Sequence, residues 1–340
     1  MDPISQGAVG AAFSQTAATR ESLRAYAIFG CLAGMAPDLD VFIQSSTDPL
    51  LFLEYHRHFT HALVFIPVGS LIVTSVLFRL FRHPLSWQQA YLAAFIGYAT
   101  HGLLDACTSY GTLLLWPFSD VRIAWNNVSV VDPLLTLPLL VLIISSATTR
   151  KRRYAVAGVA WLLAYLGLGV VQHERASDAA RQMALAKGHH PYKLSVKPGF
   201  GNLILWKTIY QHDGAYYVDA VRVAGDSQIC PGDSAEVYQA ERHLPELAGN
   251  SQQAKDIERF RWFSQDYLAA WGEPGNIIDV RYAAVPNEIT PLWGIHVDTQ
   301  APPTAHVKFV PNRRATTAQS EALWNLITGS GCHPLEGPPL

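Results

Sequence analysis

Charged residues are scarce in this sequence, at 15% of its 340 positions, whereas an average soluble protein has roughly 25%. Hydrophobic residues reach 49%, although the second half of the chain has the composition of an ordinary soluble protein. The apolar excess is therefore concentrated in the first half. This imbalance indicates a membrane-embedded part followed by a soluble part.

Cysteine is also scarce, and its spacing is uninformative for metal binding. The four cysteines form no Cys-x-x-Cys pair, which argues against a thiolate zinc site. Cys230 and Cys332 both fall in the polar half and could form a disulfide if that half is extracytoplasmic; two free thiols fit equally well. The net charge of −2 and the lack of a Lys/Arg stripe with interleaved aromatics argue against a nucleic-acid partner.

Long apolar runs are present, and all of them lie before residue 172. The third and fourth runs are each about 20 residues long, and a helix of that length rises roughly 30 Å, enough to cross the hydrocarbon core. The first two are short for full spans, so a buried soluble bundle stays open for them. The predicted helical runs are residues 4–18, 23–36, 61–80, 87–106, 130–147 and 154–171.

Basic residues give the orientation of these runs. The strongest signal is Arg150-Lys151-Arg152-Arg153, between the last two runs. The positive-inside rule places that loop in the cytoplasm. The same side then receives Arg79 and Arg82 between runs three and four, and Arg20 and Arg24 between runs one and two. The loop 108–129 and everything after residue 171 are predicted to lie outside.

From residue 172 onward the composition is that of a small soluble domain. Charged residues, glycine and proline are frequent there, and no apolar run exceeds a few residues. Strands are predicted over residues 200–210, 215–223, 276–282, 292–297 and 306–310, and helices over 255–271 and 317–327. The predicted fold class is thus mainly α: a polytopic transmembrane helical bundle, residues 1–171, followed by a small α+β extracytoplasmic domain, residues 172–340.

Three short segments at the ends of the apolar runs carry side chains suited to metal binding. The segments are Pro37-Asp38-Leu39-Asp40, His56-Arg57-His58-Phe59-Thr60-His61 and His101-Gly102-Leu103-Leu104-Asp105. On the topology given by the cations, all three approach the outer face. Because the topology was assigned without these residues, their meeting at one depth is independent information.

The residue types explain the expected chemistry. His101 and Asp105 are four apart, so on a helix they lie one turn apart on a single face. Imidazole nitrogens and carboxylate oxygens are ligands for zinc and similar divalent ions, and ionisable groups beside apolar spans are usually paired or functional. Taken singly, each motif could be a hydrogen-bonded pair, an Asx turn or a solvated loop. Together they predict a site for a divalent metal, zinc or manganese, with the ligands Asp38, Asp40, His56, His61, His101 and Asp105.

Further roles follow from this site. Asp38, His61 and Arg57 are the catalytic candidates, with a carboxylate as general base and Arg57 either orienting an anionic group or anchoring the chain at the interface. Gln6 could join the site if the first helix enters from outside. Asp132 is a further acidic candidate or, equally, the start of the fifth helix beside Pro133. Two aromatic residues of the outer loop, Tyr110 and Trp116, could form a wall of the pocket.

The chain resembles the YdjM-like family of membrane-bound metal-dependent hydrolases, also described as LexA-regulated inner-membrane proteins. The resemblance covers about residues 1–170 and rests on residues 1–8, the Pro-Asp-Leu-Asp run, the His-Arg-x-Phe-Thr-His run, residues 101–105, and the stretches 108–112 and 115–119. Some members have histidine where this chain has Gln6, and His58 fills a variable position. The family is similar to the zinc-dependent phospholipase C and P1 nuclease group, which implies an all-helical metal site acting on phosphoesters. No histidine occurs between His101 and His173, so one or two metals fit better than three.

The resulting expectation is a membrane-bound metal-dependent hydrolase of the bacterial inner membrane. It would act on a phosphoester or lipid-like substrate at the periplasmic face, with membrane lipid and a small molecule as its partners. Two other classes stay open. A transporter with a His/Asp relay would carry its polar groups on towards the cytoplasmic half, and a non-catalytic anchor would keep its stability when the histidines and aspartates are replaced.

Overall fold

The computed structural model describes residues 1–312 and 316–335, and these form two compact units. The first, here called the helical unit, comprises Met1–Ile43, Tyr55–Val170 and Phe200–Asn202. The second, the sheet unit, comprises Gln44–Glu54, Val171–Gly199 and the described residues from Leu203 onward. A short segment of the first half of the chain, residues 44–54, therefore belongs to the sheet unit.

The helical unit follows the apolar runs of the sequence. Its α-helices are α1 (Pro3–Thr16), α2 (Leu23–Met35), α4 (Ile66–Leu80), α5 (Trp87–Ala106), α6 (Pro133–Thr149) and the first part of α7 (Arg153–Ala186), joined by the 3₁₀ segments η1 (Ala36–Phe42), η2 (Phe59–His61) and η3 (Leu63–Phe65). Side chains cap these helices where the sequence supplies oxygen acceptors: Asp2 caps α1, Ser86 forms a capping box on α5, and Asp132 accepts from two amides at the start of α6. The helix-start role of Asp132 is thus confirmed.

Two predicted helix boundaries were wrong. The third run does not begin as an α-helix at His61, because residues 59–65 form 3₁₀ turns and α4 starts only at Ile66. The sixth helix does not stop at residue 171, because α7 continues as a polar, alanine-rich segment to Ala186. An apolar pattern marks where a helix could meet lipid, whereas the helix itself continues as long as residues of good helix propensity follow.

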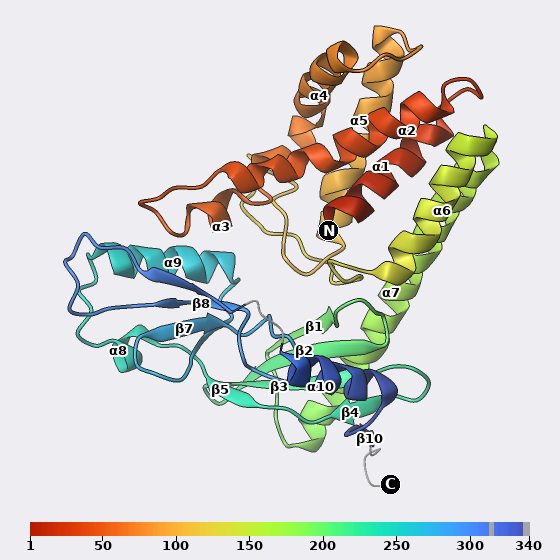
Figure 1. The fold of residues 1–340 in the computed structure, drawn as a ribbon. Helices are drawn as coiled ribbons and strands as arrows, with labels where there is room; N and C mark the ends of the chain where they lie inside the picture. The colour runs from red at the N-terminus through yellow and green to blue at the C-terminus, as the bar shows by residue number, and fades with distance from the viewer. Residues whose placement is uncertain (313–315, 336–340) are drawn as a thin grey trace. The chain divides into compact units, whose positions relative to one another are not determined.

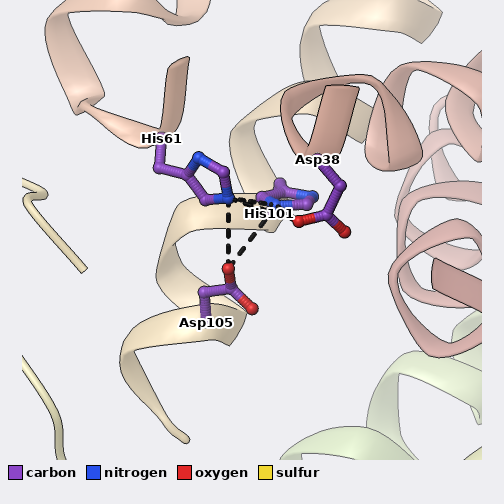
Figure 2. A group of neighbouring side chains, drawn as sticks. All are labelled: Asp38, His61, His101 and Asp105. Atoms are coloured by element: carbon purple, nitrogen blue, oxygen red, sulfur yellow. Dashed lines mark hydrogen bonds and ion pairs between the residues drawn. The ribbon is translucent and has the colours of Figure 1, made fainter. Parts of the chain in front are cut away.

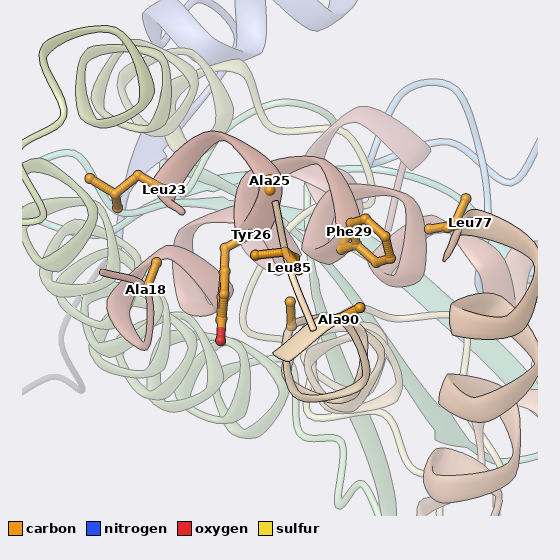
Figure 3. Packing of buried hydrophobic residues seen from close by; sticks show 9 residues of the cluster. Ala18, Leu23, Ala25, Tyr26, Phe29, Leu77, Leu85 and Ala90 are labelled. Carbon is orange, nitrogen blue, oxygen red and sulfur yellow. The ribbon is translucent and has the colours of Figure 1, made fainter. Parts of the chain in front are cut away.

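The helical unit places its basic loops and its ligand segments at opposite ends. The connections α1–α2, α4–α5 and α6–α7 lie together at the upper end in Figure 1. At that end, Leu23, Tyr26 and Phe29 of α2 pack against Leu77 and Leu85 (Figure 3). The packing of α1, α2 and α5 is closest at three glycines: a Cβ on Gly10 or Gly97 would lie 2.3 Å from the carbonyl oxygen of Gly30. Such contacts are typical of membrane helices that pack through small residues.

Large apolar side chains cover the outside of this unit. Three segments of the described chain are long and apolar enough to cross a membrane, namely Leu23–Phe42, Leu63–Leu80 and Arg153–Ala186, and α6 is a shorter apolar helix. Outward-facing side chains on α4, α6 and α7 remain well exposed, among them Val68, Ile72, Val76, Leu137, Val141, Ile144, Leu163 and Leu168. A soluble protein rarely exposes a contiguous apolar surface of this kind, so these helices have the character of lipid-facing elements.

The sheet unit contains two antiparallel sheets. One has the order β1–β2–β3–β4–β10, with β5 paired to β3, and the other has the order β6–β7–β8–β9. The bounds are β1 (Lys193–Pro198), β2 (Leu205–His212), β3 (Ala215–Arg222), β4 (Gln228–Cys230), β5 (Ser234–Glu236), β6 (Leu268–Ala270), β7 (Asn276–Asp279), β8 (Trp293–His296), β9 (Lys308–Pro311) and β10 (His333–Pro334). Residues from both sheets, including Ile209, Val218, Ile278 and Val280, share one hydrophobic core.

Four helices accompany these sheets, and one prediction about them was wrong. They are α3 (Leu51–Tyr55), α8 (Ala240–His243), α9 (Gln252–Phe263) and α10 (Thr317–Thr328). The helix predicted over residues 255–271 starts earlier, because Ser251 caps it, and ends at Phe263. Gln265 and Asp266 then take positive φ values and turn the chain into β6. The strands predicted over residues 200–210 and 276–282 are β2 and β7, with bounds shifted to 205–212 and 276–279.

A disulfide joins Cys230, at the end of β4, to Cys332, directly before β10. Of the two arrangements left open by the sequence, the structure therefore has the disulfide. It fastens the last strand and α10 to the sheet, beside a small core of Leu205, Ala220 and Leu326.

Candidate metal centre

The three ligand segments meet at one end of the helical unit. Asp38 comes from the 3₁₀ turn η1 that follows α2, His61 from η2, and His101 and Asp105 from the last turns of α5. Figure 2 shows the four side chains directed toward one another, with His101 and Asp105 one turn apart on α5. His61, His101 and Asp105 have fully buried side chains, whereas the Asp38 side chain is 16% exposed. Asp38 therefore lies at the solvent-accessible side of the cluster.

Two glycines allow these segments to approach. A Cβ on Gly102 would lie 2.3 Å from the carbonyl oxygen of His61, and one on Gly34 would lie 2.8 Å from that of Gln6. Gly102 therefore lets η2 lie directly on α5, beside His101. The phenolic oxygen of Tyr98, one turn earlier on α5, donates to the carbonyl oxygen of Thr60 at 2.9 Å and holds the same segment from below.

The distances within the cluster match the edges of a coordination polyhedron. The two Nε2 atoms of His61 and His101 are 2.8 Å apart. Asp105 Oδ2 is 3.2 Å from the first and 3.6 Å from the second, and Asp38 Oδ1 is 3.5 Å from each. Ligands bound tetrahedrally at the usual Zn–N and Zn–O lengths are separated by about 3.3 Å. The four atoms therefore surround a point at which a divalent ion of that size fits.

The hydrogen bonds of the two imidazoles set their tautomers. His101 Nδ1 lies 2.5 Å from the carbonyl oxygen of Gly34, which can only accept a hydrogen bond, so Nδ1 carries the proton. His61 Nδ1 lies 3.0 Å from Thr60 Oγ1 and 3.3 Å from Asp40 Oδ2, and the Thr60 hydroxyl itself donates to that oxygen. Both neutral rings then direct Nε2 lone pairs at each other and at two carboxylates. Outer partners of this kind are the usual companions of metal-binding histidines.

Without a cation, these lone pairs and negative oxygens repel one another. Asp38 Oδ2 and Gln6 Oε1 are, moreover, buried without a hydrogen-bond partner among the described residues. Buried polar atoms are almost always satisfied, so orphaned oxygens at a cluster of this composition are consistent with a missing cation. The residues present thus fit a divalent metal on geometry and on donor chemistry.

Arg57 faces into the protein at this site. Its Nε lies 3.1 Å from Asp105 Oδ2, and its guanidinium donates to Thr108 Oγ1 at 2.8 Å and packs over the Tyr110 ring. The backbone of Arg57 has a φ of +65°, a left-handed conformation that costs about 1–2 kcal/mol outside glycine. This conformation directs the Arg57 amide at Asp40 Oδ2, at 2.8 Å. Arg57 therefore neutralises one of the two cluster carboxylates and has the geometry of a structural partner of Asp105.

Asp40 and His56 form a second group with Asp38, within reach of one ion. Asp40 is already occupied, however. Its Oδ1 binds His56 Nδ1 at 2.8 Å, and its Oδ2 accepts from the Arg57 amide and from Thr60. A carboxylate engaged on both oxygens orients its neighbours. The geometry thus gives Asp40 and His56 the position of a support for His61.

All six residues predicted as ligands from the sequence lie in these two groups. His58, which the sequence analysis left out, packs against the rings of Tyr55 and Trp116, and Tyr110 lies edge-on to His56. Gln6 joins the cluster by donating its side-chain amide to Asp105 Oδ1 at 2.8 Å. The amino nitrogen of Met1 contacts the same oxygen.

Sequence reasoning missed three contributors. The Gly34 carbonyl has no sequence signal, since every residue has a carbonyl group. Thr60 and Gly102 lie inside the His-Arg-His-Phe-Thr-His and His-Gly-Leu-Leu-Asp segments, and their positions beside ligands were the available signal.

Comparison with known proteins places these motifs in a family. The family model described as YdjM inner membrane protein matches residues 1–176, about half of the chain. The chain belongs to this family. The matched region contains every residue of the metal cluster and ends inside α7, so the sheet unit lies almost entirely beyond it.

A more distant similarity concerns one curated protein. The uncharacterized protein YfhP of Bacillus subtilis (strain 168) is 28% identical over 103 residues, which are 30% of this chain and 31% of that protein. The chain thus matches about a third of the length of this relative, whose name states no activity. No solved structure matches the chain. Membership of an inner-membrane family, together with the apolar helices, shows that this is a membrane protein with a possible His/Asp metal site.

Proposed function

We propose that this member of the YdjM family is a metal-dependent hydrolase whose divalent ion, zinc or manganese, is held by Asp38, His61, His101 and Asp105. The observation that carries the proposal is the convergence of two Nε2 atoms and two carboxylate oxygens, with both Nδ1 atoms bound to outer acceptors. Asp40 and His56 then act as supports, a smaller ligand set than the six residues predicted from the sequence.

The protein's own groups divide the work in this proposal. A divalent ion, when bound, supplies Lewis acidity toward a phosphoryl or carbonyl oxygen and lowers the pKa of water. Asp38 is the exposed member of the cluster, so its free oxygen is available as a general base toward a water or substrate proton. Arg57 holds Asp105 in its charged form by direct ion pairing, and its burial supports this role over direct substrate contact.

A lipid-like phosphoester is the substrate class that the surroundings support. Asp38 is followed on η1 by two exposed apolar side chains, Leu39 and Phe42. The loop after α5, which hydrogen-bonds to the ligand segment through Leu113 and Leu114, exposes Leu115, Phe118 and Val121. Exposed apolar residues beside the accessible ligand favour an amphiphilic substrate, because its acyl part gains from contact with them.

We further propose that the site and the sheet unit face the periplasm. The four consecutive basic residues between α6 and α7 lie at the end of the helical unit opposite the cluster, which supports a cytoplasmic position for that end. The Cys230–Cys332 disulfide supports an oxidising compartment for the sheet unit. A periplasm-only reporter fused after Gln172 tests this orientation, and activity of a cytoplasm-only reporter at that position would contradict it.

Metal analysis of the purified protein tests the site. We expect about one equivalent of zinc or manganese in the wild type and a loss in His101→Ala and Asp105→Ala. His58→Ala is the matched control, because His58 lies in the same segment but packs on Trp116 away from the cluster. Equal metal content in all variants would reject the ligand set.

A phosphoesterase screen with added zinc or manganese, on soluble esters and on phospholipid vesicles, tests the reaction. Hydrolysis that disappears in His101→Ala supports the enzyme. Metal binding without any hydrolysis would instead favour the anchor or the transporter.

A further inference from the structure

The sheet unit holds a segment whose two ends lead directly into the metal cluster. Residues 44–54 lie between Asp40 and His56 in the sequence, yet they pack with the sheet unit, and Leu50 and Leu53 are buried there. Asp48 caps the following turn by accepting from the Leu50 amide at 3.0 Å, and the Phe52 ring meets Phe309 edge-on. The anchored segment, residues 44–54, is thus a folded excursion of the ligand-bearing chain.

One arginine of α9 fastens this excursion. Arg259 donates to both carboxylate oxygens of Asp48, at 2.7 and 3.0 Å, and its Nε donates to Glu54. A bidentate arginine–carboxylate pair is among the most directional ion pairs in proteins. Arg259 also pairs with Asp256, a fully buried carboxylate that binds His306 Nδ1 and the Val307 amide. The guanidinium is therefore held in place from within the sheet unit.

The distances along the chain make this anchor relevant to the site. Glu54 is two residues before His56, so at most about 7 Å of extended chain separates them. The Asp40–His56 hydrogen bond closes the loop that contains the anchored segment. A free loop of this length loses conformational entropy on closure, whereas a loop already fixed by Arg259 has lost that entropy beforehand. The anchor therefore favours the Asp40–His56 pair, and Asp40 in turn contacts Nδ1 of His61.

We propose that Arg259 is a positioning residue for the metal centre. By holding residues 44–54, it fixes Asp40 and His56, so the sheet unit tunes the affinity of the site for its ion. This inference rests on the proposed metal function, and it gives the sheet unit a role in that function.

The test compares two arginines of the same helix in the full-length protein. Arg261 has a similar exposure to Arg259 but pairs with Glu258 and Asp266 and does not reach the anchored segment. Zinc affinity is measured by competition with a chelator. We expect Arg259→Ala to bind zinc about three- to tenfold more weakly, at the lower end of the effects seen for outer partners of metal ligands. Arg261→Ala should bind like the wild type.

Two further measurements keep the test decisive. Arg259→Lys retains the charge but loses the bidentate contact, so its zinc affinity should fall between those of the wild type and Arg259→Ala; it also serves if the alanine variant does not fold. Hydrogen exchange of residues 56–61 should rise in Arg259→Ala and stay unchanged in Arg261→Ala.

Equal zinc affinity of the two alanine variants would overturn the positioning role. A wild type that binds no zinc or manganese would instead refute the proposed function. In that case the exchange of residues 56–61 alone decides whether the anchor reaches this segment, and unchanged exchange would overturn the inference as well.

Discussion

Gly102→Ala should weaken metal binding without altering any ligand. A Cβ at this position would lie 2.3 Å from the His61 carbonyl oxygen, whereas real Cβ atoms essentially never approach another atom within 3.0 Å. The η2 segment must therefore recede from α5 by at least 0.7 Å, the difference between these two distances. The neighbouring atom is backbone, so no flexible side chain can absorb the change.

The size of the effect follows from the tolerance of metal coordination. Metal–ligand distances hold to within about 0.2 Å, so a shift of the His61 backbone by several times that amount displaces Nε2 from a bonding position. We expect zinc affinity to fall by about ten- to a hundredfold, as for the loss of a partner that orients a ligand. Equilibrium titration against a chelator, with the protein in detergent, measures this directly.

A matched control separates coordination from general damage. Gly167 of α7 also lies in a helix, and a Cβ there meets nothing within 4 Å. Gly167→Ala should leave zinc binding unchanged and leave stability equal or slightly higher, because alanine favours the helix by up to about 1 kcal/mol. Wild-type zinc affinity in Gly102→Ala would show that His61 is not held in coordination by its contact with α5.

Three further predictions concern the sheet unit and the cluster. Replacing Cys230 and Cys332 by alanine should destabilise the sheet unit by about 4–5 kcal/mol in the chain-entropy model, given their separation of 102 residues, and denaturant unfolding monitored by tryptophan fluorescence measures the loss; unaltered stability would contradict it. Burial lowers the pKa of Lys197 and of Lys207 to about 7, so the unfolded chain binds more protons between pH 7 and the ordinary lysine range, and stability should rise over that interval by up to about 1.4 kcal/mol per pH unit for each lysine. Lys207→Met should reduce this slope in unfolding curves recorded from pH 7 to 9, and an unchanged slope would refute its source. Asp105→Asn should lower metal content while leaving the helical CD signal intact, whereas His58→Asn should change neither.

Much of the helical unit could be predicted from sequence, because lipid-facing helices require long apolar runs whose positions are visible without a partner. The depth of the ligands could be predicted for the same reason. The division between coordinating and supporting carboxylates could not. Asp38 and Asp40 differ by two positions in one turn, and only the arrangement of the Arg57 amide, Thr60 and His56 around Asp40 distinguishes their roles.

The sheet unit was less predictable for a related reason. Strands such as β4, β5 and β10 are two or three residues long, and their extended conformation depends on partners far away in the sequence. The membership of residues 44–54 in the sheet unit had no local signal either, since it depends on Arg259, which follows more than two hundred positions later.

The close approach of Gly10, Gly30 and Gly97 has a consequence for ion selection. Backbone atoms of α1, α2 and α5 touch there directly, so no side chain lies between them that could adopt another rotamer and change the spacing. η1 continues from α2 and carries Asp38, while α5 carries His101 and Asp105. The width of the coordination cavity is thereby set by peptide groups. A protein built in this way accepts or rejects an ion by its radius, and its preference can be altered only by moving whole helices.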